Sequence, residues 1–76
     1  MMTKTNFTRT FRAQDSKGQD FLIEEYIVYE EVFSGKTSDW KELERLLFLN
    51  GSLVKFNEKD QTFIVMESNN ILSLVS

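Results

Sequence analysis

Apolar and polar residues alternate along the first third of the chain. Phe7, Phe11 and Ala13 lie at odd positions among threonines and arginines, and residues 21–32 read FLIEEYIVYEEV. A period of two residues, with many β-branched and aromatic side chains, is typical of β-strands that bury one face. The pattern therefore predicts two antiparallel strands joined near Gly18.

The segment between these strands fixes their register. We place Gly18 in the left-handed position of a three-residue loop, Ser16–Gly18, where Asp15 can accept backbone N–H groups. The register pairs Ala13 with Phe21, Phe11 with Ile23, Phe7 with Ile27, and Arg9 with Glu25. A slip by one residue would destroy these pairs, because successive side chains point to opposite faces. Asp15 and Gly18 are thus explained as a hairpin tip, without a ligand.

The second half of the chain carries further hairpin signals. Asn50-Gly51 between two apolar runs predicts a type I′ turn. Polar turns are expected at residues 57–60 and 68–70. The resulting registers pair Leu47 with Val54, Phe48 with Leu53, Phe56 with Phe63, Val54 with Val65, and Ile64 with Leu74.

Residues 33–39 are expected to form a long loop, and residues 39–47 after it are compatible with two structures. Asp39 followed by Glu42 resembles a helix capping box, and the apolar residues behind it have helical spacing. The stretch nevertheless runs directly into the Asn50-Gly51 hairpin, which favours a strand. We expect at most one short helix near 39–47.

Apolar residues occupy both faces of the last strands, which happens when a sheet curls on itself or is covered on its second side. The sequence therefore predicts a mainly β fold: an antiparallel curled sheet or a small open barrel of five to six strands. A length of 76 residues allows one domain. We expect a frayed tail over residues 1–6 and a single β-rich domain over residues 7–76.

The composition excludes most catalytic chemistry. The chain has no cysteine and no histidine, which removes thiolate sites, the commonest general base and the commonest metal ligand. Glu24-Glu25 and Glu30-Glu31 are adjacent pairs on a strand, so their members point to opposite faces and cannot share a proton. We expect no enzyme activity, no cofactor and no metal. Cysteine-free composition fits a cytoplasmic protein, and no apolar run is long enough to cross a membrane.

The hairpin residues resemble a known group of proteins. Phe11-x-Ala13-x-Asp15-x-x-Gly18-x-x-Phe21 is similar to the start of a group of short bacterial proteins of unknown function. Their second half corresponds here to a set of core and turn positions: Leu46, Gly51, Val54, Phe63, Val65 and Leu72. The resemblance covers about residues 10–75 and implies a shared fold. It implies no activity and no site residues.

Two classes of function remain open. The first is an interaction module that binds another protein, or its own copy, through a strand edge or through one face of residues 21–32. Its candidate contact residues are Leu22, Tyr26, Val28 and Trp40. The second is a small-barrel nucleic-acid binder using aromatic stacking and the cations Arg9, Arg12 and Lys17.

The distribution of charge favours the first class. Residues 1–20 carry four cations against two carboxylates, whereas residues 21–40 carry five carboxylates against one lysine. The aromatic residues thus lie among carboxylates, which repel phosphate. The face of Leu22, Tyr26 and Val28 is core if the sheet closes, and a contact surface if it stays open. We expect a monomer in preference to a homodimer, because Glu30-Glu31 disfavours edge pairing.

Overall fold

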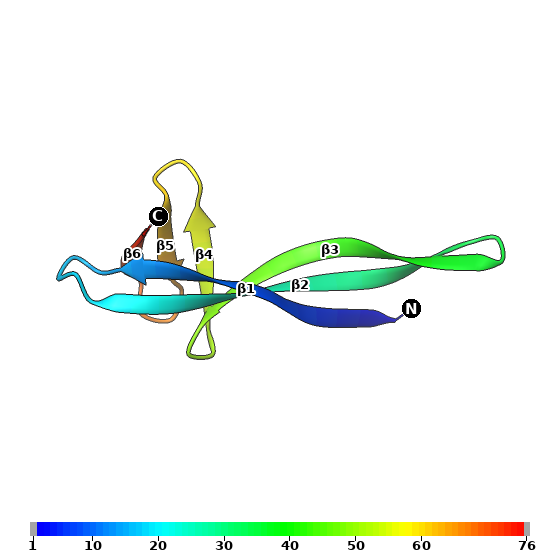
Figure 1. The fold of residues 1–76 in the computed structure, drawn as a ribbon, viewed down its shortest axis with the longest axis horizontal. Helices are drawn as coiled ribbons and strands as arrows, with labels where there is room; N and C mark the ends of the chain where they lie inside the picture. The colour runs from blue at the N-terminus through cyan, green and yellow to red at the C-terminus, as the bar shows by residue number, and fades with distance from the viewer. Residues whose placement is uncertain (1, 76) are drawn as a thin grey trace.

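Six antiparallel strands form in the computed structural model, which describes residues 2–75 (Figure 1). They are β1 (Thr3–Gln14), β2 (Asp20–Ser34), β3 (Thr37–Leu49), β4 (Ser52–Asn57), β5 (Thr62–Val65) and β6 (Asn70–Leu74). Each strand pairs with the next, and β6 returns to β1, so the sheet closes into a small barrel. The predicted mainly β fold is confirmed. Residues 2–75 include no helix of the length and apolarity needed to cross a membrane.

The barrel closes through a short seam. β1 and β6 pair only through Ala13 with Leu74 and Gln14 with Ser73, and the Val75 N–H donates to the Arg12 carbonyl at 2.9 Å. Inward-facing side chains of five strands meet behind this seam and form the core: Ala13, Ile23, Val54, Phe63, Val65 and Leu72. The core therefore lies at the end of the molecule where all six strands meet.

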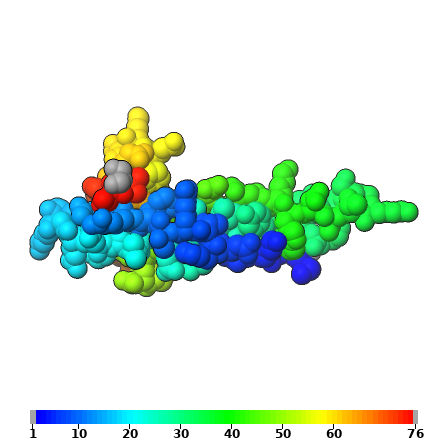
Figure 2. All heavy atoms as spheres, viewed as in Figure 1, coloured from blue at the N-terminus to red at the C-terminus, as the bar shows by residue number. Residues whose placement is uncertain are grey.

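The three long strands continue beyond the barrel as a single-layer arm (Figure 1). We call this segment the arm: residues 3–8 of β1, 26–34 of β2 and 37–46 of β3. The molecule measures 55 × 22 × 18 Å, and its radius of gyration is 15.4 Å. A compact chain of this length would have a radius of gyration of about 11 Å. The arm projects as a narrow extension in the space-filling view (Figure 2), so much of its sheet faces water.

The β1–β2 hairpin has the predicted loop. Gly18 has φ +80°, and Asp15 Oδ1 accepts the N–H groups of Lys17 and Gln19, each at 2.9 Å. The predicted pairs of Ala13, Phe11 and Arg9 are all observed. The pairing of Phe7 with Ile27 is wrong, because Thr8 forms a β-bulge and shifts Phe7 opposite Tyr26. A bulge adds one residue to one strand and reverses the faces beyond it.

The region 33–49 differs from expectation in two ways. The expected long loop over 33–39 is a tight two-residue turn, with Gly35 at φ +64° and Ser34 paired with Thr37. The possible helix near 39–47 is a strand, because β3 pairs with β2 from Thr37 to Phe48 apart from the bulge at Leu43. Similarly, residues 3–6, expected to fray, pair with the far end of β2. The long β2 supplies a backbone partner to both neighbours.

The last hairpins confirm most of the expected registers. Asn50 and Gly51 have φ of 49° and 85°, as a type I′ turn requires. The pairings of Leu47 and Phe48 with β4, and of Val54 and Phe56 with β5, are also observed. The pairing of Ile64 with Leu74 is wrong. Ile64 lies opposite Ile71, because the turn between β5 and β6 begins after Val65.

Replacing Gly18 by valine is expected to lower the free energy of unfolding by at least about 1 kcal/mol. No heavy atom lies within 4 Å of a Cβ built at this position, so the cost comes from the left-handed backbone and not from a clash. Urea midpoints of the two proteins would measure it. An unchanged midpoint would contradict the strain argument.

Candidate functional site

The four predicted contact residues do not form one surface. Leu22, Tyr26 and Val28 all lie at even-numbered positions of β2 and therefore share a face. Trp40 pairs with Glu31, an odd-numbered position of the same strand, and therefore lies on the opposite face. Leu22 is 61% exposed beside the barrel, whereas Tyr26 and Val28 are half-buried on the arm.

Tyr26 is the centre of an aromatic cluster. Its ring contacts Phe7 edge-on, with centroids 5.6 Å apart, and contacts Phe48 in the same manner at 5.7 Å. Leu46 pairs with Tyr26, and Val28 follows on the same face. We call these five residues the aromatic face: Phe7, Tyr26, Val28, Leu46 and Phe48. The cluster joins β1, β2 and β3, and the bulge at Thr8 brings Phe7 into it.

Carboxylates surround the aromatic face. The Tyr26 hydroxyl donates to Glu24 Oε2 at 3.1 Å, and this hydrogen bond raises the pKa of Tyr26 above its ordinary value. Glu44 pairs with Val28, and Glu30 lies on the same face two residues further along β2. Lys41, opposite Glu30, is the cation of this region. The surface therefore combines exposed apolar side chains with an acidic border.

The opposite face of the arm carries a separate cluster. The Lys4 ammonium lies 4.3 Å from the centroid of the Trp40 ring and 5.6 Å from that of Tyr29. Such cation–π contacts contribute about 0.5–1 kcal/mol at exposed sites. Lys4 thereby fastens the N-terminal part of β1 across β2 to β3. The Trp40 ring is thus already in contact with a cation of its own chain.

A cluster of ion pairs around the buried Glu25 marks the junction of barrel and arm. Glu25 is 5% exposed; its Oε1 accepts the Thr8 hydroxyl at 2.7 Å and Arg9 Nε at 3.1 Å, and Arg45 lies 3.7 Å from Oε2. Burial alone would raise the pKa of Glu25. The hydrogen bonds from Thr8 and Arg9 and the two positive charges outweigh burial, so the pKa lies below its ordinary value.

Beside this cluster the barrel mouth encloses a cavity of about 630 Å³. Its apolar walls are the inward-facing residues Phe11, Leu47, Val54, Phe56, Phe63 and Leu74. The polar residues that also line it are Arg9, Glu25, Arg45, Lys55 and Gln61. The β3–β4 ladder begins at Leu49 and ends at Leu47 with Val54, so the two strands diverge at this point. A cavity of 300–1,000 Å³ with few polar groups is typical of small-molecule sites.

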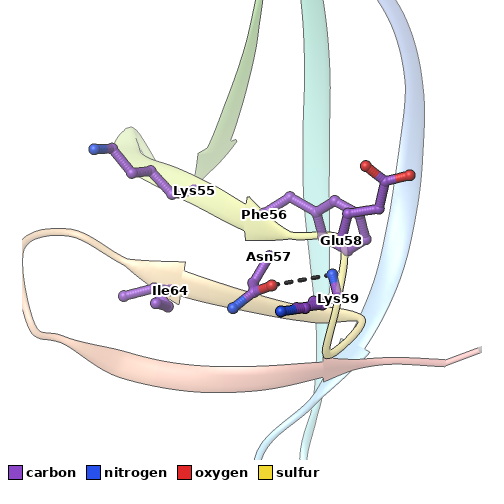
Figure 3. A pocket seen from close by; sticks show the side chains of 6 residues that line it. All are labelled: Lys55, Phe56, Asn57, Glu58, Lys59 and Ile64. Atoms are coloured by element: carbon purple, nitrogen blue, oxygen red, sulfur yellow. Dashed lines mark hydrogen bonds between the residues drawn. The ribbon is translucent and has the colours of Figure 1, made fainter.

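A second hollow lies outside the barrel, against the β4–β5 hairpin (Figure 3). Lys55 and Phe56 leave β4 in different directions there (Figure 3). The Asn57 side chain accepts the Lys59 N–H at 3.0 Å and so stabilises the turn. The hollow lies between the side chains of this turn and those of the two strands that it joins, and we do not assign it a ligand.

The basic residues considered for nucleic-acid binding are not brought together. Arg9 is paired with Glu25 and points inward, whereas Arg12 lies on the other face, 2.9 Å from Asp20. Lys17 lies at the hairpin tip. No group of three or more carboxylates able to hold a metal ion occurs in the described part of the chain.

Sequence reasoning missed Phe7, Phe48 and the burial of Glu25. The pairing of Arg9 with Glu25 was predicted, and a cation opposite an anion on an otherwise apolar face is a signal for such a junction. No sequence signal identified the bulge at Thr8, which decides the face of Phe7. Leu46 and Phe48 could have been grouped with Tyr26 once β3 was taken as a strand.

No protein-family model, characterised protein or solved structure shows significant similarity to the chain.

Proposed function

We propose that the protein is a non-enzymatic interaction module that binds another protein through the aromatic face. The observation that carries this proposal is the single-layer arm, which leaves large apolar side chains in water. Phe7 on the aromatic face is 54% exposed, and Leu43 on β3 is 51% exposed. Exposed apolar clusters bordered by polar residues are typical of protein contact sites.

The border indicates the chemistry of the partner. Glu24, Glu30 and Glu44 would lie at the rim of a contact made by the aromatic face. A partner with an apolar centre and flanking lysine or arginine residues would match both features. A second copy would place the same carboxylates against one another, so the charge favours a different protein and a monomeric chain.

The nucleic-acid alternative receives no comparable support. Two of its three cations, Arg9 and Arg12, are engaged by carboxylates and lie on different faces. The three aromatic rings of the aromatic face, those of Phe7, Tyr26 and Phe48, are bordered mainly by carboxylates. A single-strand binder combines stacking aromatics with a continuous basic groove.

The proposal predicts that Phe7→Glu strongly weakens binding to the partner, whereas Phe33→Glu does not. Both residues are exposed phenylalanines of the arm, but Phe33 lies near the hairpin at residues 35–36, on the face opposite Tyr26. Proteins captured from the native cell by the wild-type chain would be identified, purified and titrated against all three chains. We expect Phe7→Glu to weaken the binary affinity at least tenfold, Phe33→Glu less than twofold, and rising salt to weaken the wild-type complex.

Two results would contradict the proposal. Equal affinities of the two variants would place the contact elsewhere. Sedimentation of the purified chain as a dimer that Phe7→Glu dissociates would show that the occupant of the aromatic face is a second copy. Circular dichroism of each variant would establish that the fold is intact before either result is interpreted.

A further inference from the structure

The cavity at the barrel mouth lies on the inner face of the sheet, away from the aromatic face. Its apolar walls come from β1, β3, β4, β5 and β6, so it belongs to the barrel and not to the arm. Phe56 pairs with Phe63 on β5, and their rings lie 4.9 Å apart. Phe56 is still 40% exposed, because β3 diverges from β4 beside it. The cavity is therefore open to solvent at one end and closed by the core at the other.

Arg9 is the guanidinium at this cavity whose terminal N–H donors are free in the described part of the chain. Its Nε donates to Glu25, and its guanidinium carbon lies 4.5 Å from the centroid of the Phe11 ring. Neither terminal nitrogen has a hydrogen-bond partner among residues 2–75. A guanidinium held through Nε and stacked on an aromatic ring presents its remaining N–H groups in a fixed direction.

The other charged groups at the cavity are either paired or directed away from it. Arg45 lies between Glu25 at 3.7 Å and Glu42, whose carboxylate accepts from two of its nitrogens. Glu25 itself accepts from Thr8 and Arg9. Lys55 contributes to the lining, but it pairs with Ile64 and not with the inward-facing Phe63, so its side chain leaves the outer face of β4. Arg9 thus remains as the available positive group.

We infer that the barrel mouth binds a small amphipathic carboxylate, with its aliphatic or aromatic body against the apolar walls and its carboxylate on Arg9. A terminal carboxylate matches the paired N–H groups of a guanidinium and completes their hydrogen bonds. An apolar body fills a cavity whose other surfaces offer mainly carbon atoms. Glu25 also lines the cavity and acts here as a positioning residue, because its carboxylate is taken up by Thr8 and Arg9 and fixes the orientation of Arg9.

Decanoate is a suitable probe, and 1-decanol and decyltrimethylammonium share its chain length without its negative charge. Amide chemical shifts of the full-length protein would follow each titration. We expect saturable shifts for decanoate at Phe11, Leu47, Phe56 and Leu74, with a dissociation constant of about 1 mM or lower. Decanol should bind at least fivefold more weakly, and the cationic amphiphile should show no saturation. This comparison of ligands requires no variant.

Arg9→Gln and Arg12→Gln provide the matched pair of variants. Both remove one positive charge from β1, and only Arg9 lines the cavity. Arg9→Gln should weaken decanoate binding at least fivefold, and Arg12→Gln less than twofold. If Arg9→Gln does not fold, Phe56→Ala, which removes a partly exposed wall residue, replaces it with the same expectation. Equal binding of decanoate and decanol, absence of saturation, or shifts confined to the arm would overturn the inference.

Discussion

Replacing Phe63 by alanine is expected to lower the free energy of unfolding by about 3–5 kcal/mol. Phe63 is 1% exposed, and its ring lies 6.0 Å from that of Phe11 and 4.9 Å from that of Phe56. Folded domains are stable by roughly 0.05–0.15 kcal/mol per residue, so in a chain of 76 residues this loss is a large part of the total free energy of unfolding. The variant should therefore be largely unfolded at 37 °C. Urea denaturation followed by circular dichroism would measure the change.

Ile71→Ala is the control for this measurement. Ile71 precedes the buried Leu72 on β6, but it is 61% exposed and pairs with Ile64 on the outer face. Its truncation should cost less than about 1 kcal/mol, because exposed side chains lose little buried area. Similar losses in the two variants would contradict a core centred on Phe63.

Local signals predicted the β1–β2 and β3–β4 hairpins correctly, because the turn residues act through their own backbone. Asp15 and Gly18 define one loop, and Asn50-Gly51 defines another, whatever the rest of the chain does. The alternation of apolar and polar residues along each strand then keeps the same register for several residues beyond the turn. This is why the pairs of Ala13, Phe11, Val54 and Phe56 could be predicted from the sequence.

The bulges could not be predicted in this way. Thr8 in β1 and Leu43 in β3 each lack a direct partner in β2, and each changes the register of every pair beyond it. Nothing in threonine or leucine marks a bulge, because neither residue has a positive φ that would require glycine or asparagine. The position of Phe7 in the aromatic face, and hence the composition of that face, follows from one such event.

The region 39–47 illustrates competition between local and long-range preference. Asp39 and Glu42 have the spacing of a helix cap, but β2 extends to Ser34 and needs a partner for its backbone groups. A strand that turns tightly at Gly35 can pair with β2 from Ser34 back to Glu24, whereas a helix would leave those groups unpaired. Tertiary pairing therefore outweighs the weak helical signal.

Part of the candidate site was predictable, because the alternation of side chains along a strand fixes which residues share a face. Leu22, Tyr26 and Val28 were placed on one face of β2 from the period of two residues alone, and the structure keeps them there. Their partners Phe7, Leu46 and Phe48 depend on the β1 bulge and on β3 being a strand. The separation of Trp40 from this face likewise depends on long-range register.

The arm and the barrel are held together where Glu25 is buried. Thr8, Arg9 and Arg45 approach its carboxylate from the strands on either side of β2. The side chain of Glu25 is 7% exposed, whereas those of Arg9 and Arg45 are more than half exposed. Loss of the carboxylate therefore removes hydrogen bonds to a charged group, and it leaves two cations that water can solvate.

Glu25→Gln is expected to lower the free energy of unfolding at pH 7 by about 1–3 kcal/mol. The pKa of Glu25 is lower in the folded protein than in the unfolded chain, so the unfolded chain takes up the proton first as pH falls. The stabilisation is complete above the unfolded pKa of about 4.3 and is lost below it, as pH approaches the folded pKa. The difference between wild type and Glu25→Gln should thus be largest at pH 7 and shrink below about pH 4. Urea midpoints from pH 7 to pH 3 would test this. Replacement of the exposed Glu44 by glutamine is the charge-matched control. A difference between wild type and Glu25→Gln that is constant with pH would show that the Glu25 charge does not stabilise the junction.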